Sequence, residues 1–326
     1  MIRVVLSVIC LWSAIGLWWT IGVSPAWGYR VAIFDFDDRH PFPDELGRHV
    51  ESRLAALLDD VVVEHFCGRG DEQRAVRILV GIEQQGFDLA IVRTSDALII
   101  AQHTLFNTPT LYTNANNPLI LGFRTLGPPG GNISGASYYI PVEKHLRVYR
   151  VIQPSLQHPG FIFDLNNQSC HGEIPETQEA CARLGLTFDV EFVETTAQLP
   201  QAARALIGRG ADAVVAATSG MIYENIDAFI DVTDQAGIPI YSFYKTGVQQ
   251  GAVAAMSSDF FQMADELLLP MAVRVLRDKI SPGDMPAAFL KRNKVFINIG
   301  QAGKLHLSIP DRIRLDASDL IIEKIP

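Results

Sequence analysis

The 326-residue chain has no excess of basic residues and lacks the signatures of hydrolytic or metal-dependent enzymes. Its 27 lysines and arginines stand against 36 aspartates and glutamates, a formal net charge of −9, which argues against nucleic-acid binding. The eight histidines form no His-x-x-x-His pair, no Gly-x-Ser-x-Gly elbow occurs, and the aspartates that begin at Asp35 do not have EF-hand spacing. We therefore expect a protein that is not an enzyme, with no metal site and no cofactor.

Only four cysteines occur, too few for a disulfide-rich scaffold. Cys10 follows bulky residues where a lipoprotein signal needs small ones, so lipid attachment there is not supported. The other three, Cys67, Cys170 and Cys181, do not have the spacing of metal ligands. An oxidising compartment would permit a bridge between Cys170 and Cys181, and the alternative is that all three are small buried side chains.

A long uncharged run occurs at the N-terminus, where residues 4–23 follow Arg3. Small residues Ala26 and Gly28 then precede Tyr29 in the arrangement of a signal-peptidase site, so residues 1–28 are interpreted as a cleaved secretory signal peptide. This predicts a periplasmic or other extracytoplasmic protein. The alternative is a retained membrane anchor, because the run is 20 residues long and Trp18-Trp19 suits a membrane interface.

Two stretches, residues 86–95 and 210–219, share one pattern of glycine, aspartate, an apolar run and Thr-Ser. An apolar run of this kind is typical of a parallel strand buried on both faces, and the Thr-Ser is suited to begin a helix. Two further pairs repeat in the same order, residues 33–38 with 162–167 and residues 108–112 with 238–242. The repetition predicts two similar halves.

Strands and helices alternate in both halves, which predicts doubly wound parallel α/β sheets. In the first half the expected strands are 29–34, 61–66, 87–92 and 109–113, and in the second 161–163, 188–193, 213–217 and 238–243. A long helix is expected over 260–277 with a kink at Pro270. Residues 133–138 and 251–257 are expected to be crossing segments between the halves.

Ligands of open parallel sheets bind beyond the carboxyl ends of the strands, so two facing sheets would surround one cleft. Helix N-termini after Thr94 and Thr218 are suited to a carboxylate or another anion, although Thr-Ser can also serve only as a cap. Aromatic residues near the strand ends would contact an apolar part of the ligand, or else belong to the core. The predicted ligand-binding residues are Asp35, Phe36, Thr94, Ser95, Thr113, Asn114, Asp164, Thr218, Ser219, Tyr223 and Tyr244.

Six short segments are specific by their combination and their order along the chain: residues 129–135 (PGGNISG), 237–241 (GIPIY), 251–255 (GAVAA), 259–262 (DFFQ), 298–302 (NIGQA) and 307–310 (LSIP). With them, about residues 108–321 resemble the substrate-binding proteins of ABC transporters, specifically the family with tryptophan- and other aromatic amino-acid-binding members. The resemblance implies a type I periplasmic-binding fold, with two lobes joined by three crossings. The expected division is residues 29–137 plus 250–285 for lobe 1 and 138–249 plus 286–326 for lobe 2.

The chain departs from the family pattern at three places. Asn117-Pro118 replaces Asp-Pro, Thr218-Ser219-Gly220 replaces Thr-Asp-Asn, and Phe163-Asp164 replaces Tyr-Asn. Two candidate positions thereby lose a carboxylate, which weakens the expectation of an amino-acid ammonium group, although Asp164 is placed to compensate.

The resulting hypothesis is an exported, monomeric solute-binding protein. Its lobes would close around an amino acid or a small organic anion for delivery to an ABC permease in the membrane. The alternative is a periplasmic ligand-sensing module that reports to a signalling partner, because the same fold serves both functions. An enzyme on a flavodoxin-like scaffold ranks lower, since no set of acid, base and nucleophile is present.

Overall fold

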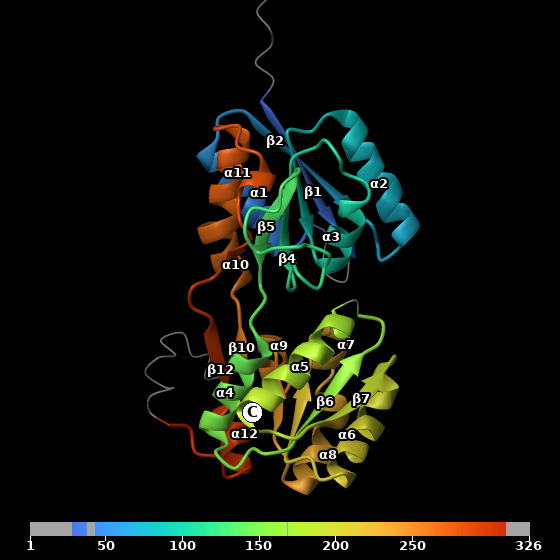
Figure 1. Ribbon diagram of the computed structural model, residues 1–326, viewed down its shortest axis with the longest axis vertical. Helices are drawn as coiled ribbons and strands as arrows, with labels where there is room; N and C mark the ends of the chain where they lie inside the picture. The colour runs from blue at the N-terminus through green and yellow to red at the C-terminus, as the bar shows by residue number, and fades with distance from the viewer. Residues whose placement is uncertain (1–27, 38–42, 168, 311–326) are drawn as a thin grey trace, which may run out of the picture.

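The computed structural model describes residues 28–37, 43–167 and 169–310. These residues form two α/β lobes that are stacked along the long axis of the molecule and joined on one side (Figure 1). The predicted signal peptide, or membrane anchor, lies outside the described residues except for Gly28. Among the described residues, no helix has the length and apolar character needed to cross a membrane.

The first lobe is built on a six-stranded parallel sheet in the order β11-β5-β4-β3-β1-β2. Residues 31–34 of β1 are fully buried because helices cover both faces, which explains their unbroken apolar character. The strands are β1 (Tyr29–Asp35), β2 (Val61–Cys67), β3 (Leu89–Arg93), β4 (Thr110–Ala115), β5 (Ile133–Ser137) and β11 (Ala288–Phe289).

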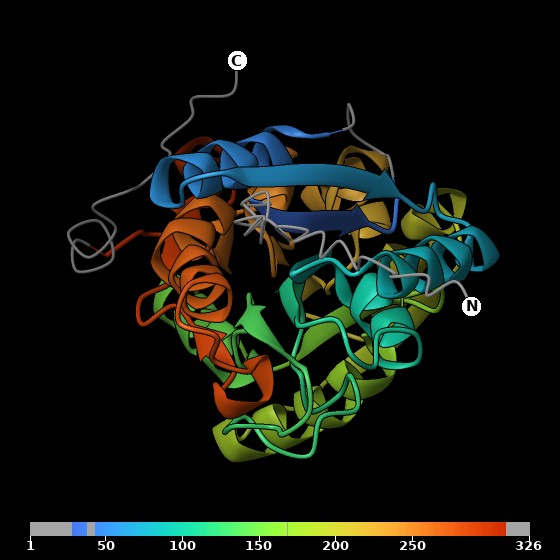
Figure 2. The ribbon, with the colours of Figure 1, turned by 90° about the horizontal axis from the view of Figure 1, so that it is seen from above.

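Helices α1 (Glu45–Leu57) and α11 (Leu269–Leu276) lie side by side on one face of this sheet, although they are distant in sequence (Figures 1 and 2). Helices α2 (Glu72–Gln85) and α3 (Ser95–Gln102) cover the other face. Aspartates begin two of these helices. Asp44 accepts a hydrogen bond from the Gly47 N–H at 2.7 Å, and Asp71 accepts one from the Arg74 N–H at 2.6 Å.

The second lobe has a sheet of the order β12-β10-β9-β8-β6-β7, parallel except for the antiparallel pairing of β12 with β10. Apolar clusters again fill both faces. The strands are β6 (Pro159–Asp164), β7 (Asp189–Val193), β8 (Ala213–Ala216), β9 (Ile240–Ser242), β10 (Ala254–Ser257) and β12 (Lys294–Ile297). The helices are α4 (Val142–Ile152), α5 (Cys170–Leu184), η1 (Thr196–Gln198), α6 (Leu199–Gly208), α7 (Gly220–Tyr223), α8 (Asp227–Ala236), α9 (Lys245–Gln249) and α12 (Ile299–Lys304). The predicted fold class is confirmed.

The chain passes between the lobes three times, at residues 138–141, 258–259 and 290–293. These positions correct the expected division at two places. Residues 254–257 belong to the second lobe because β10 pairs with β9 there, and residues 288–289 belong to the first because β11 pairs with β5. The small apolar residues of β10 looked like a crossing, whereas they form an interior strand of the second sheet.

The expected long helix consists of three segments, α10 (Phe260–Met263), the π-helical turn η2 (Ala264–Leu268) and α11. Pro270 has no N–H for the backbone ladder, and the π-helical turn lies directly before it. The short helix η3 (Pro282–Asp284) follows. Of the alternatives for the cysteines, the structure shows small buried side chains at Cys67, Cys170 and Cys181, and no disulfide joins Cys170 to Cys181.

Candidate functional site

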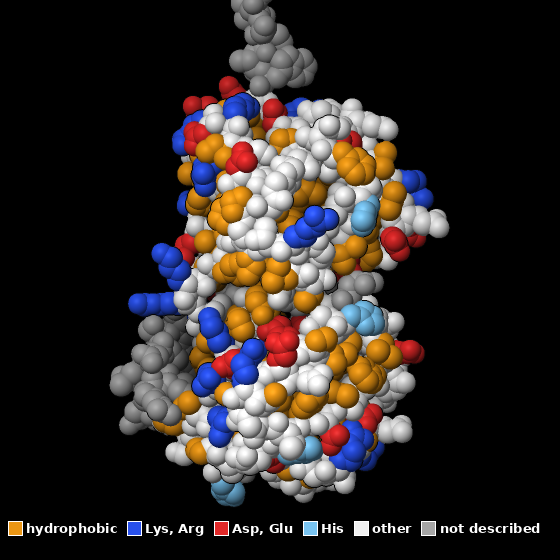
Figure 3. Space-filling model, viewed as in Figure 1, with side chains coloured by type: hydrophobic (Ala, Val, Ile, Leu, Met, Phe, Trp, Pro, Cys, Tyr) orange, Lys and Arg blue, Asp and Glu red, His pale blue; other side chains and the backbone are white. Residues whose placement is uncertain are grey.

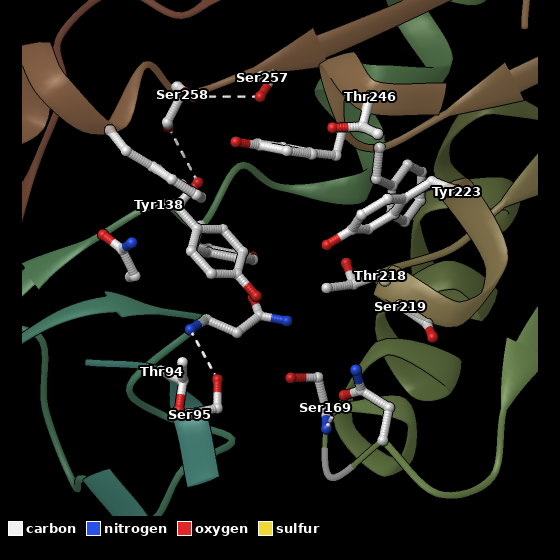
Figure 4. Close-up of a pocket in the computed structure, with 18 of the residues that line it drawn as sticks. Thr94, Ser95, Tyr138, Ser169, Thr218, Ser219, Tyr223, Thr246, Ser257 and Ser258 are labelled. Atoms are coloured by element: carbon white, nitrogen blue, oxygen red, sulfur yellow. Dashed lines mark hydrogen bonds between the residues drawn. The ribbon is translucent and has the colours of Figure 1, made fainter. Parts of the chain in front are cut away.

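A cleft of about 850 Å³ lies between the two lobes and is lined by residues from both lobes and from the crossings. In the space-filling view, acidic side chains are visible at the narrow waist where the lobes meet (Figure 3). The close-up shows Thr94 and Ser95 on one wall and Thr218 and Ser219 on the other, as the repeated sequence pattern predicts (Figure 4). We refer to this space as the interlobe cleft.

Most of the predicted ligand-binding residues line the interlobe cleft. They are Asp35, Thr94, Ser95, Asn114, Asp164, Thr218, Ser219, Tyr223 and Tyr244. The strand ends of both sheets therefore converge on one space, and their role in binding remains a prediction.

Phe36 and Thr113 are not part of the cleft lining, which corrects their predicted placement. Phe36 packs against the apolar cluster beneath α2 and α3. Thr113 is buried within the sheet, where its carbonyl accepts a hydrogen bond from the Thr94 N–H at 3.1 Å. Thr113 thus supports a residue of the wall instead of facing the cleft.

The two Thr-Ser pairs share a position but differ in chemistry. Thr94 caps α3, accepting a hydrogen bond from the Ala97 N–H at 3.3 Å, and has a φ of 91°, which is strained for a threonine. Ser219 precedes α7 but forms no cap hydrogen bond. Its hydroxyl instead donates to Asp164 at 2.7 Å. Backbone strain thus distinguishes Thr94 of the first pair from Ser219 of the second, which is extended.

Glu173, on the first turn of α5, is the main residue that the sequence did not reveal. Its side chain is buried in the cleft wall, with the residue only 4% exposed. The Asn116 side-chain amide, from the first lobe, donates to Glu173 Oε1 at 2.7 Å, and the Thr218 N–H donates to Oε2 at 3.3 Å. Burial raises the pKa of Glu173 to about 7, although these two hydrogen bonds oppose the rise. Nothing in the sequence around this helical glutamate indicates that its side chain is buried in the cleft wall.

Four aromatic residues form one corner of the interlobe cleft, and we call them the aromatic corner: Tyr138, Tyr223, Tyr244 and Phe260. Tyr244 stacks on Phe260 with ring centroids 5.2 Å apart, and Tyr223 lies 5.3 Å from Tyr244. Tyr138 comes from the first crossing, and its hydroxyl and that of Tyr223 point into the same space (Figure 4). Tyr138 is not among the predicted ligand-binding residues. Its place at the end of an expected crossing could have indicated it, because the crossings pass beside the cleft.

Among the residues that the structure describes, the lining of the cleft is strongly acidic, with nine carboxylates against three lysines and arginines. The carboxylates are Asp35, Asp37, Asp44, Glu45, Asp96, Asp164, Glu173, Glu176 and Glu224, and the basic residues are Arg48, Arg93 and Lys245. The cleft thus has carboxylates at positions other than the two that depart from the family pattern. The effect of those departures on an ammonium group stays a prediction.

Arg93 is the most buried of the basic residues, with 5% of its surface exposed. Its guanidinium donates to both oxygens of Asp44 at 2.8 and 2.6 Å and to Asp35 at 3.2 Å. Burial raises the pKa of Asp35 to about 7, while Arg93 opposes the rise. Because its positive charge is shared by two carboxylates, Arg93 is poorly placed to attract a free anion.

Sequence comparisons place the chain beside known binding proteins. Residues 58–321 match the model of a family described as ABC transporter substrate binding protein. The chain is 24% identical over 215 residues to a tyrosine-binding protein of Clostridioides difficile (strain R20291), a match covering 65% of this chain and 61% of that relative. The alignment thus spans about three fifths of the relative's length.

Solved structures of the same fold include an ABC domain from Streptococcus pneumoniae in complex with L-Trp. It has a TM-score of 0.77 and 19% identity, over 90% of this chain and all of that one. A conserved domain protein from Vibrio cholerae has a TM-score of 0.76 and 20% identity, over 90% and 99% of the two chains. At these identities the likeness establishes the fold.

Proposed function

Because the chain belongs to the ABC transporter substrate-binding protein family, we propose that it captures a small amino acid-like ligand between its lobes and delivers it to an ABC permease. Members of this family bind substrates and are not catalysts. The single observation that carries the choice of ligand is the acidic lining of the cleft, where the described residues supply nine carboxylates against three basic side chains.

This charge balance discriminates between the two ligand classes that the sequence left open. A small organic anion would enter a cleft of the same sign of charge, where water is restricted and electrostatic interactions are stronger than in bulk solvent. An amino acid brings an ammonium group for the carboxylates and a carboxylate for the hydroxyl groups of the two walls. The hydroxyls of Ser95 and Thr218 and the ammonium of Lys245 are suited to that carboxylate.

The aromatic corner supports an apolar or aromatic side chain on the ligand. Stacked and edge-to-face arrangements of rings are favourable beyond the area that they bury. Tyr244 and Phe260 already stack in this way and contribute one ring from each lobe. The tyrosine-binding relative and the L-Trp complex of the same fold agree with this choice.

Lobe closure follows from the arrangement of the site. A ligand that contacts both walls binds more tightly to the closed state, so it shifts the population toward closure. Export is part of the same proposal. Residues 1–28 would direct the chain out of the cytoplasm, and the permease would recognise the closed form.

Calorimetry and thermal unfolding with matched ligands test the proposal. The panel consists of L-tryptophan, L-tyrosine and L-phenylalanine, together with 3-phenylpropionate, which lacks the amino group, and phenethylamine, which lacks the carboxylate. We expect an L-amino acid to bind most tightly, and at 100 times its Kd to stabilise the fold by about 2.7 kcal/mol. Tighter binding of 3-phenylpropionate than of L-phenylalanine, or no binding by any amino acid, would contradict the proposal.

A further inference from the structure

Glu173 is a buried carboxylate in the cleft wall that has hydrogen-bond donors but no cationic partner. Among the residues that the structure describes, no ion pair reaches it. A buried charge of this kind is costly unless it is paired. A carboxylate has about four acceptor positions, and the bonds from Asn116 and Thr218 leave room for another donor.

The groups that face Glu173 do not supply the missing positive charge. Glu176 lies one turn further along α5, Cys170 lies in its first turn, and Tyr138 and Tyr139 approach from the first crossing. All of these are acidic or neutral. His145 also lines the cleft, but burial lowers its pKa to about 3, so it is neutral at physiological pH.

The partner residue Asn116 comes from the opposite lobe. It lies directly after β4 in the first lobe, whereas Glu173 is on α5 of the second, 57 residues away. The 2.7 Å hydrogen bond between them therefore spans the two lobes and requires the lobes to be close. Separation of the lobes would break this bond.

We propose, on the basis of the function proposed above, that Glu173 accepts the ammonium group of the ligand and that its bond to Asn116 couples this recognition to lobe closure. Glu173 is thus a specificity-determining residue. It selects ligands with an amino group, and this selection is strongest when Asn116 is hydrogen-bonded to Glu173.

The proposal predicts proton release on binding. A ligand ammonium favours the ionised form of Glu173 and lowers its pKa from about 7. Below that value, binding must remove a proton, so affinity rises with pH and levels off above it. From pH 6 to pH 8 the ionised fraction increases about tenfold, and we expect an increase of about the same size in affinity. Asp35 also has a raised pKa and lines the same cleft. The Glu173→Gln variant below therefore separates the contribution of Glu173 to the pH dependence from that of Asp35.

The experiment measures the affinity of the best-binding L-amino acid of the panel at pH 6, 7 and 8, in two buffers of different ionisation enthalpy. Glu173→Gln should weaken binding on the order of 10- to 100-fold at pH 8 and remove the Glu173 part of the pH dependence and of the proton release. Glu179→Gln, on the same helix but with its side chain 70% exposed, should match the wild type. Asn116→Ala should weaken binding several-fold while proton release persists.

Each outcome is decisive. Unchanged affinity in Glu173→Gln, or a pH profile with the same amplitude as that of the wild type, overturns the role of Glu173. Unchanged affinity in Asn116→Ala overturns the coupling to closure. Because Asn116 lies outside α5, this variant still tests the proposal if Glu173→Gln folds poorly. If the wild type binds an amino acid and both variants keep the wild-type affinity and pH dependence, only this inference is overturned. A wild type that binds no amino acid removes the proposed function with it.

Discussion

Ile120 of the first lobe packs directly on Gly172 of the second lobe. A Cβ atom added at Gly172 would lie 2.4 Å from both the Cβ and a Cγ atom of Ile120, closer than side-chain atoms can approach. Gly172 adjoins Glu173 on α5, so the absence of its side chain permits the lobe contact beside the bond between Glu173 and Asn116. The closed arrangement of the lobes therefore depends on glycine at this position.

Gly172→Ala is expected to hold the lobes apart and to weaken ligand binding roughly tenfold, because closure would need Ile120 to move. Calorimetry would measure the affinity, and small-angle scattering would show a larger radius of gyration in the presence of ligand. Gly208→Ala is the matched control, since it is also helical and has no atom within 4 Å of the added methyl group. Wild-type affinity in Gly172→Ala would contradict this account, and Gly172→Ala with Ile120→Ala should restore binding.

Glu173→Gln is expected to make the unliganded protein more stable at alkaline pH. The pKa of about 7 in the folded protein lies above the ordinary glutamate value of 4.5, so the stability contributed by neutral Glu173 is complete below about pH 4.5 and is lost as pH rises through 7. At pH 8 the free energy of unfolding of the variant should therefore exceed that of the wild type by about 1–3 kcal/mol, and at pH 4.5 the difference should vanish. Urea unfolding at the two pH values measures both. A difference that does not depend on pH would show that ionisation of Glu173 carries no such cost.

The fold was predictable because its local signals agree with its topology. The buried strands that end in Thr94-Ser95 and Thr218-Ser219 repeat along the chain, and apolar runs that alternate with helices are typical of a parallel sheet. The lobe boundaries were not predictable from residues 251–257, because small apolar residues fit a crossing as well as an interior strand. Only the pairing of β10 with β9 distinguishes the two, and this pairing is a tertiary contact.

The cleft lining was predictable where strand ends define it and was not predictable where tertiary contacts define it. Asp164 and Tyr244 follow strands and line the cleft as expected, whereas Glu173 is held in the wall by a hydrogen bond from Asn116 of the other lobe. Phe36 illustrates the opposite error. It follows β1 as expected, but its ring packs beneath helices instead of facing the cleft. Side-chain direction in the last residues of a strand is set by packing that the sequence pattern does not specify.

Phe260→Ala is expected to lower the affinity for aromatic amino acids by about three- to tenfold, because the ring stacked on Tyr244 at 5.2 Å is lost from the aromatic corner. Affinity for L-alanine, which lacks an aromatic ring, should change little. Calorimetry with both amino acids gives the ratio. Phe106→Ala is the control, since this ring is 67% exposed and lies outside the cleft lining. An equal loss for both ligands would assign Phe260 to packing of the crossing.

Arg93→Met is expected to destabilise the protein by about 3–5 kcal/mol at pH 8, because Asp35 and Asp44 would remain close together without their shared cation. Part of this loss should be recovered at pH 5, since an unpaired, buried Asp35 has its pKa raised further and can become neutral. Urea unfolding at both pH values measures the change. Arg53→Met removes an exposed guanidinium that pairs with Asp265 and should cost less than about 1 kcal/mol. If Arg93→Met lowered the free energy of unfolding no more than this control, the ion pairs of Arg93 with Asp35 and Asp44 would not hold the end of β1 to the start of α1. The first-lobe wall would then depend on packing alone.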